Sequence, residues 1–205
     1  MSDSMTLEEV MYNCRAMRRL KTDEIPEEKL LKLIDAARQA PSGSNTQNSR
    51  WVVVRDPAVK KQLADLNRLH AEPYIAPQRE NPRDDKQRRL LEAVVWQMDH
   101  MHEIPALVVA CFEYPEKVDG LGVYRSAGSV WPGIQNLLLT ARSLGLGAAP
   151  TTLALRDQDA VRDILNLPET FAALCLIPVG YPMGNFGPVS RKPLSEVMSF
   201  DRWGS

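Results

Sequence analysis

The sequence predicts one domain of the α/β class in the broad sense, in which helices separate four short strands around a shared core. Two observations support this fold class. The chain has 205 residues, of which 44% are hydrophobic and 25% charged, so it can bury a sizeable core within the usual length of one domain. Short apolar runs alternate with segments of helical periodicity, and we find no internal repeat.

Capping residues and apolar periodicity predict six helices. Thr6 and Glu9 form a capping-box pattern, and Pro26 opens the second helix. Asp56 and Asp157 stand where capping residues precede two further helices. The predicted helices cover residues 6–18, 26–40, 56–69, 86–102, 129–144 and 157–167.

Apolar runs bounded by turn residues predict strands at residues 51–55, 106–112, 148–152 and 173–180. The segment 71–85 contains three prolines and many charges, which is typical of a loop. Because a helix follows it, we expect residues 71–102 to form a lid-like excursion from the domain and not a boundary between domains.

The charge balance and the cysteines exclude several classes of protein. With 25 basic and 26 acidic residues, the chain has no overall field that would favour nucleic acid or an anionic membrane. Its longest apolar runs are shorter than the roughly 20 residues of a membrane helix, and its acidic start lacks a secretory signal, so we expect a cytoplasmic protein. Cys14, Cys111 and Cys175 suggest neither a disulfide framework nor a zinc site. His100 and His102, two apart on a helix, do not suggest a metal site either.

Three separated segments have the chemistry of a site for a flat, phosphorylated, electron-carrying ligand. Arg15, Arg18 and Arg19 lie near the start, the polar run PSGSNTQ covers residues 41–47, and SRKP covers residues 190–193. Guanidinium groups bind phosphate oxygens in a bidentate way, and the polar run offers donors and acceptors to the edge of a ring.

Each segment also has an ordinary interpretation. The arginines could form a solvated helix end, and PSGSNTQ could simply terminate a helix. The glycines of LGLGAAP lack the spacing of a dinucleotide fingerprint, so a Rossmann site is not expected. Neither Ser42 nor Ser190 has the sequence context of a hydrolase nucleophile.

Taken together, the N-terminal arginines, APSGSNTQ, SLGLGAAPTT and VGYPMGNFGPVSRKPL resemble the nitroreductase family of FMN-dependent oxidoreductases, over roughly residues 6–203. The resemblance implies an α+β fold, a three-layer α/β sandwich with a mixed central sheet and helices on both sides, in an intertwined homodimer. Residues 1–205 would form one FMN-binding domain, with a C-terminal tail at about 182–205 that embraces the partner. FMN would lie at the subunit interface, between residues of both chains.

The resemblance assigns the arginines to the phosphate end of FMN. Arg15 and Arg18 fall on the family's basic N-terminal motif and would hold the phosphate or the ribityl chain, and Arg19 could replace either. Arg191 matches a phosphate-binding arginine near the C-terminus. Cys14 stands where an arginine is common in the motif, which leaves more of the phosphate charge to the remaining arginines.

Other matched positions surround the flavin ring. The resemblance places a polar loop along the ring and the ribityl hydroxyls, and a second group at the long helix and the strand after it. These residues are Ser42, Gly43, Asn45 and, as a support, Gln47, then Ser129, Pro150, Thr151 and Thr152. The two threonines would offer backbone amides to flavin N5 and O4.

The function implied is an FMN-dependent oxidoreductase that uses NADH or NADPH to reduce nitroaromatics, quinones or related electron-poor small molecules by a ping-pong mechanism. Because the flavin supplies the hydride chemistry, no catalytic acid or base is assigned. The alternative is a non-enzymatic, flavin-sequestering protein whose ring face is covered by residues 71–102 or by Tyr74, Trp96 or Tyr124. Specialised dehalogenation chemistry of related family branches is a third possibility.

Overall fold

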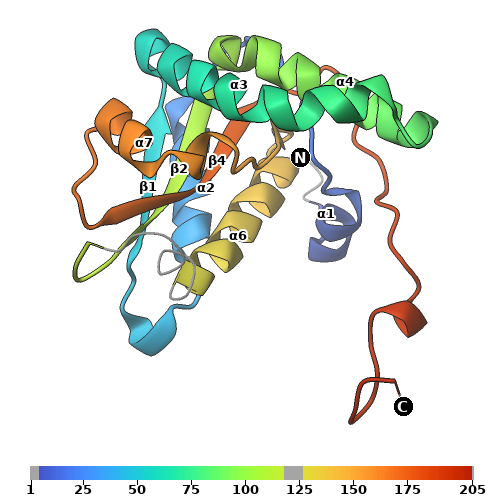
Figure 1. Cartoon of the computed structure of the whole chain (residues 1–205). Coiled ribbons are helices and arrows are strands. Elements are labelled where there is room, and N and C mark those ends of the chain that lie inside the picture. Colours follow the sequence, from blue (N-terminus) through green and yellow to red (C-terminus); the bar gives the residue numbers. More distant parts are fainter. Residues whose placement is uncertain (1–4, 118–126, 205) are drawn as a thin grey trace.

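A computed structural model describes residues 5–117 and 127–204 and shows a sheet with helices on both faces (Figure 1). The four predicted apolar runs form the strands β1 (Ser49–Val54), β2 (Ala106–Glu113), β3 (Gly147–Ala148) and β4 (Phe171–Gly180), in the order β1-β2-β4-β3. The third strand is shorter than predicted. It ends before Pro150, and Thr151 pairs with Leu176 only as an isolated bridge, because a proline has no N–H to continue the ladder.

The sheet differs from the expected mixed sheet, since all adjacent strands in the described residues are antiparallel. Two long helices, α3 (Pro57–Glu80) and α4 (Asp85–His100), connect β1 to β2. The chain leaves the end of β1 along α3 and returns along α4 to the same edge of the sheet, so β2 runs antiparallel to β1. Strands β2 and β3 do run in the same direction, but β4 lies between them.

Helices cover both faces of the sheet, which confirms the three-layer α+β sandwich. On one face α2 (Glu27–Arg38) and α6 (Val130–Ser143) pack against β2 and β4 through Leu33 and Leu137, which are fully buried. On the other face α3 and α7 (Gln158–Leu165) bury Leu63 and Val161 against the same strands. The short helix α1 (Leu7–Asn13), which begins at the predicted capping box of Thr6, lies against α6.

Close packing fixes the position of α6. A side chain at Gly133 would lie 2.9 Å from the carbonyl oxygen of Ala37 in α2 and 2.9 Å from the ring of Trp51 in β1. Only a glycine allows α6 to approach these two elements so closely. The two ends of α6 are therefore set precisely relative to α2 and the sheet.

Two sequence-based predictions of local structure are wrong. Residues 71–80, predicted as a loop, are the last part of α3, which continues through Pro73 and Pro77. Each proline removes a helical hydrogen bond, but burial of Ala71 and Ile75 holds the helix together. The first helix ends at Asn13 and not near Arg18, because the chain that follows is extended and pairs elsewhere.

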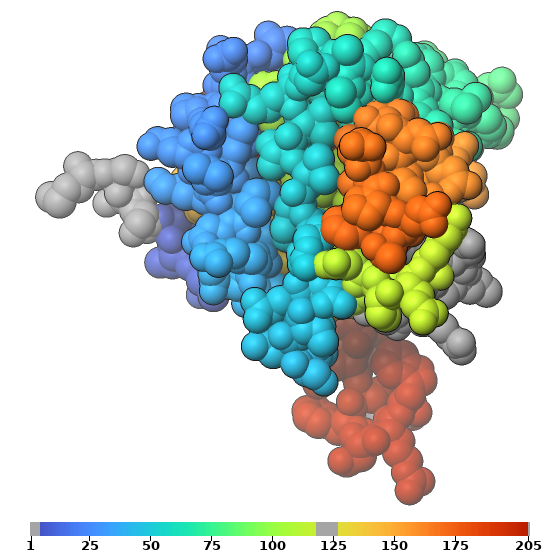
Figure 2. All heavy atoms as spheres, turned by 90° about the vertical axis from the view of Figure 1, so that its left-hand side faces the viewer, coloured from blue at the N-terminus to red at the C-terminus, as the bar shows by residue number. Residues whose placement is uncertain are grey.

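Residues 182–204, called here the C-terminal arm, leave the sandwich after β4 and protrude from the body of the molecule (Figures 1 and 2). The arm has little regular structure beyond one turn at Leu194–Glu196. Beyond residue 193, its large apolar side chains are exposed, namely Leu194, Val197, Met198, Phe200 and Trp203. Among the described residues, no helix is both long and apolar enough to cross a membrane.

Candidate cofactor site

The segment that carries the N-terminal arginines is held between β3 and the C-terminal arm. The backbone N–H of Met17 donates to the carbonyl oxygen of Ala148 at 3.0 Å. On the arm, the N–H of Met183 donates to the carbonyl oxygen of Arg19, also at 3.0 Å. These bonds replace the predicted last turn of the first helix and place residues 14–19 beside the arm.

A cavity of about 210 Å³ lies where this segment, the arm and the end of α6 meet. Three guanidinium groups line it, those of Arg15, Arg142 and Arg191, together with Cys14, Phe186 and other residues. No aspartate or glutamate of the described chain lines it. We call it the cationic cavity, and its composition suits an anion such as a phosphate monoester.

The cavity brings together three of the residues predicted from the sequence, Arg15, Pro150 and Arg191. The backbone at Gly187 comes close to Arg15, since a β-carbon there would lie 3.7 Å from Nη1 of the arginine. Arg18 and Arg19 do not line the cavity. Arg18 is half-buried, its burial lowers the pKa of its guanidinium, and within the described residues no carboxylate pairs with it.

Arg142 is the residue of the cavity that sequence reasoning missed. It lies in the last turn of α6, where a basic residue usually has the ordinary role of compensating the helix dipole. In the structure its guanidinium carbon lies 4.1 Å from the centre of the Phe186 ring. A signal did exist, because the motif SLGLGAAPTT, assigned to the site, begins directly after this arginine.

The three cysteines have different environments. Cys14 is half-buried in the cationic cavity, and burial raises the pKa of its thiol, although Arg142 and Arg191 act in the opposite direction. Cys111 and Cys175 are fully buried in the core, and burial raises the pKa of each thiol to about 12, so both remain protonated.

The polar loop, residues 42–47, follows α2 and is exposed apart from a partly covered Ser42. The hydroxyl of Ser42 accepts a hydrogen bond from the backbone N–H of Gln47 at 2.9 Å, which closes the loop. Ser44, Asn45 and Gln47 have positive φ angles of 50°, 54° and 52°, a conformation that is rare for residues other than glycine. Such strain is concentrated at functional sites in proteins, so the loop remains a strong candidate.

One chain does not bring the polar loop to the cationic cavity. Helices α2 and α6 are antiparallel, because Lys29 at the start of α2 donates to the carbonyl oxygen of Leu144, and Asn136 donates to that of Ala36 near the end of α2. The loop after α2 therefore lies near the start of α6 (Figure 1), whereas the cavity lies at the end of α6. Fourteen helical residues separate the two by about 20 Å.

The remaining predicted residues are divided in the same way. Ser129 precedes α6, at the end of this helix that lies near the polar loop. Thr151 and Thr152 instead follow Pro150, which lines the cationic cavity. The suggestion that Thr151 offers its amide to the flavin is wrong, because this N–H donates to the carbonyl oxygen of Leu176 at 2.8 Å. Thr152 is exposed, and its amide forms no hydrogen bond with the described residues.

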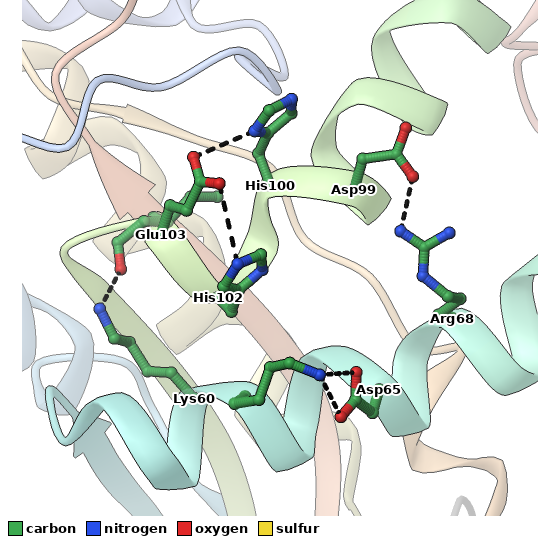
Figure 3. Close-up of polar contacts among 9 residues, drawn as sticks. Lys60, Asp65, Arg68, Asp99, His100, His102 and Glu103 are labelled. Atoms are coloured by element: carbon green, nitrogen blue, oxygen red, sulfur yellow. Dashed lines mark hydrogen bonds and ion pairs between the residues drawn. The ribbon is translucent and has the colours of Figure 1, made fainter.

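A second group of charged residues, between α3 and the end of α4, has its partners within the chain (Figure 3). Glu103 contacts His100 at 3.0 Å and His102 at 3.7 Å. Buried Lys60 donates to the carbonyl oxygen of Ile104 at 2.7 Å, and burial lowers the pKa of its ammonium group. Across the described part of the chain, no three His, Cys, Asp or Glu side chains are grouped as a metal site requires.

The predicted excursion at 71–102 is a pair of packed helices with a cavity of about 330 Å³ between them. Ile75 and Met98 line this cavity together with Arg79 and Glu80. Of the aromatic residues considered as covers for a ring, Tyr74 is exposed and Trp96 stacks on His100. Tyr124 lies outside the described residues.

Fold and site together define a class of protein, a three-layer α+β protein with a cation-lined cavity at the end of a long helix and a strained polar loop at its start. The chain belongs to the nitroreductase family, whose sequence model matches residues 13–181.

Relatives of this chain include enzymes with two different names. An iodotyrosine deiodinase of Thermotoga neapolitana is 29% identical, with 90% of this chain and 91% of the relative covered. An NADH dehydrogenase of Thermus thermophilus is 28% identical, with 90% of each chain covered. A solved iodotyrosine deiodinase bound to FMN and 3-iodo-L-tyrosine is 26% identical and has a TM-score of 0.72, covering 98% of this chain and all of that one.

Proposed function

We propose that this protein is an FMN-dependent oxidoreductase that binds FMN between two copies of the chain, accepts a hydride from NADH or NADPH, and passes it to a nitroaromatic, a quinone or a related electron-poor small molecule. The cationic cavity is the observation that carries this proposal. Its arginines, with no acidic residue of the described chain beside them in the lining, fit the dianionic phosphate of FMN. The cytoplasmic location expected from the sequence belongs to the same proposal.

The cavity would hold the phosphate end of the cofactor. Arg15 and Arg191 approach it from segments far apart in the sequence and make no ion pair within the described residues. A phosphate there would gain charge-assisted hydrogen bonds that replace contacts with water. The isoalloxazine ring would then extend away from the cavity, past Pro150 and the free amide of Thr152.

The polar loop would reach this ring from a second copy of the chain. In its own chain the loop lies about 20 Å from the cavity, at the other end of α6. Its positive φ angles and its exposed Asn45 are what a ligand-binding loop offers to a second chain. The exposed apolar side chains of the C-terminal arm support such a pairing, since an isolated subunit would leave them in water.

When bound, FMN supplies the redox chemistry, because its ring accepts a hydride and gives up electrons to an acceptor. The residues of this chain would bind the phosphate and position the ring. The amide of Thr152 is a hydrogen-bond donor free to face the polar edge of a ring. No side chain of the site is required to act as an acid or base, so transfer depends on close stacking at the open face. A ping-pong mechanism, in which donor and acceptor use this face in turn, belongs to the proposal.

Reductive dehalogenation of a halogenated phenol is a second candidate for the acceptor reaction. It is favoured by the relatives named iodotyrosine deiodinase, which match about nine tenths of this chain.

Rapid mixing of the FMN-loaded protein with NADH or NADPH, and then with an acceptor, tests the proposal. We expect either nicotinamide to bleach the flavin absorbance, and a nitroaromatic or a quinone to restore it in a separate step. Restoration by a halogenated phenol alone, with release of halide, would select the second candidate. A fully occupied flavin that neither nicotinamide bleaches would instead support the sequestering protein considered from the sequence.

A further inference from the structure

The cationic cavity contains one arginine more than the resemblance to the family assigns to it. Arg15 and Arg191 were assigned to the phosphate, but Arg142 was not. All three guanidinium groups line a cavity of about 210 Å³ that has no acidic residue of the described chain in its lining. Three like charges at such a site repel one another, so their convergence is unfavourable until an anion is bound.

The environment of Arg142 is incomplete in the chain alone. Its Nε atom is buried and has no hydrogen-bond partner within the described residues. Buried donors almost always have a hydrogen-bond partner in folded proteins, and leaving one unpaired is unfavourable. The ring of Phe186 lies over the face of the guanidinium, with 4.1 Å between the ring centre and the guanidinium carbon.

Cys14 gives a reason for an additional arginine. It lines the same cavity, and it stands where an arginine is common in the family. Arg142 and Arg191 both act electrostatically on the Cys14 thiol, so the guanidinium of Arg142 lies near the space that a side chain at position 14 occupies.

We propose that Arg142 is a phosphate ligand of the FMN site and supplies, from the end of α6, the positive charge that Cys14 does not. This inference rests on the proposed FMN site and adds a residue to it. The dianionic phosphate would accept hydrogen bonds from Arg15, Arg142 and Arg191, and Phe186 would hold the plane of Arg142 in place.

Comparison of FMN with riboflavin, which lacks the phosphate, tests the role of Arg142 directly. We expect Arg142→Gln to weaken FMN binding by about tenfold or more, measured by quenching of flavin fluorescence, and to leave riboflavin binding within about twofold. Arg142→Lys should lose less FMN affinity than Arg142→Gln, because lysine keeps the positive charge but cannot form the bidentate hydrogen bonds of a guanidinium group. Arg55→Gln is the matched control, since Arg55 pairs with Glu27 at 3.6 Å and lies outside the cavity.

A merely structural Arg142 would give different results. If it only stabilises the end of α6, Arg142→Gln would lower the unfolding temperature of the FMN-free protein and weaken both flavins equally, which would overturn the inference. Unchanged FMN binding would overturn it as well. Failure of the unmodified protein to bind FMN at all would instead refute the proposed function.

A second test measures a gain of FMN affinity when a positive charge is returned to the cationic cavity at position 14. Adding Cys14→Arg to the Arg142→Gln variant should recover most of the lost FMN affinity, because the new guanidinium enters the same cavity. No recovery in a folded double variant, together with equal loss for FMN and riboflavin in Arg142→Gln, would show that Arg142 does not bind the phosphate.

Discussion

The cationic cavity and the polar loop are assigned to the same cofactor, yet the chain builds them in opposite ways. Backbone hydrogen bonds from β3 and the C-terminal arm hold the segment that carries Arg15, and Phe186 packs on Arg142. The polar loop is largely exposed, strained at three residues and closed by one hydrogen bond that the side chain of Ser42 accepts from the backbone N–H of Gln47. In the proposed site, one chain would therefore supply the arginines of the phosphate end, whereas the loop at the ring end would come from a second chain.

The largest effect is expected from substitutions that prevent the C-terminal arm from docking on a second chain. Phe200→Ser combined with Trp203→Ser removes two side chains that are 77% and 80% exposed in the single chain. Burial of each is worth about 1.5 to 3 kcal/mol, so we expect a dimer at least about a hundredfold weaker by sedimentation. Leu31→Ser, at an exposed position on α2, is the control. A monomeric parent protein that still binds FMN tightly would contradict the shared site.

The second-largest effect is expected when one arginine of the cationic cavity is replaced, because FMN affinity should then fall. We expect Arg191→Ala to reduce FMN affinity by about tenfold or more, because a charge-assisted hydrogen bond contributes about 1.5 to 3 kcal/mol. Arg55→Ala should leave affinity unchanged, since Arg55 lies outside the cavity. Isothermal titration with FMN measures both variants, and equal affinities would remove Arg191 from the site.

A smaller effect is expected at the strained loop. Ser42→Ala deletes the hydroxyl that accepts from Gln47 and should allow the loop to relax. We expect FMN affinity to fall by roughly twofold to tenfold, with the unfolding temperature of the FMN-free protein nearly unchanged. Ser143→Ala is the control, because the hydroxyl of Ser143 likewise forms one hydrogen bond with the backbone, in this case by donating to the carbonyl oxygen of Thr140. Equal FMN binding by both variants would show that the loop does not need its closed shape.

The smallest effect concerns Lys60, a cation whose partner lies within the chain. Burial lowers its folded pKa below the ordinary value of about 10.4, so the unfolded state binds more protons in the interval between the two values. The free energy of unfolding should therefore rise with pH across this interval, relative to Lys60→Met. Urea unfolding at several alkaline pH values measures this difference. FMN affinity should stay the same, in contrast to the arginines of the cavity.

Much of the fold could be predicted from the sequence, because capping residues and apolar runs are local signals. The capping box of Thr6 and the apolar run at 173–180 located their elements correctly. Local signals misled where tertiary packing prevailed, as in the helix that continues through Pro73 and Pro77. They also predicted a helix up to Arg18, where pairing with Ala148 extends the chain instead.

The candidate site was predicted in part, for a related physical reason. Residue types indicated phosphate chemistry at Arg15 and Arg191, and the structure brings these two together. Arg142 was missed because a basic residue in the last turn of a helix already has an ordinary explanation. The distance along α6 between the loop and the cavity depends on the antiparallel packing of α2 and α6, which no motif expresses.

The position of β4 affects the timing of synthesis. Because β4 lies between β2 and β3, the sheet cannot close until residue 180 has been made. The exposed apolar side chains of the C-terminal arm all lie after this residue, so they leave the ribosome later than the strand that completes the sheet. The order of synthesis therefore presents the core of one chain before the segment that would recruit a second chain.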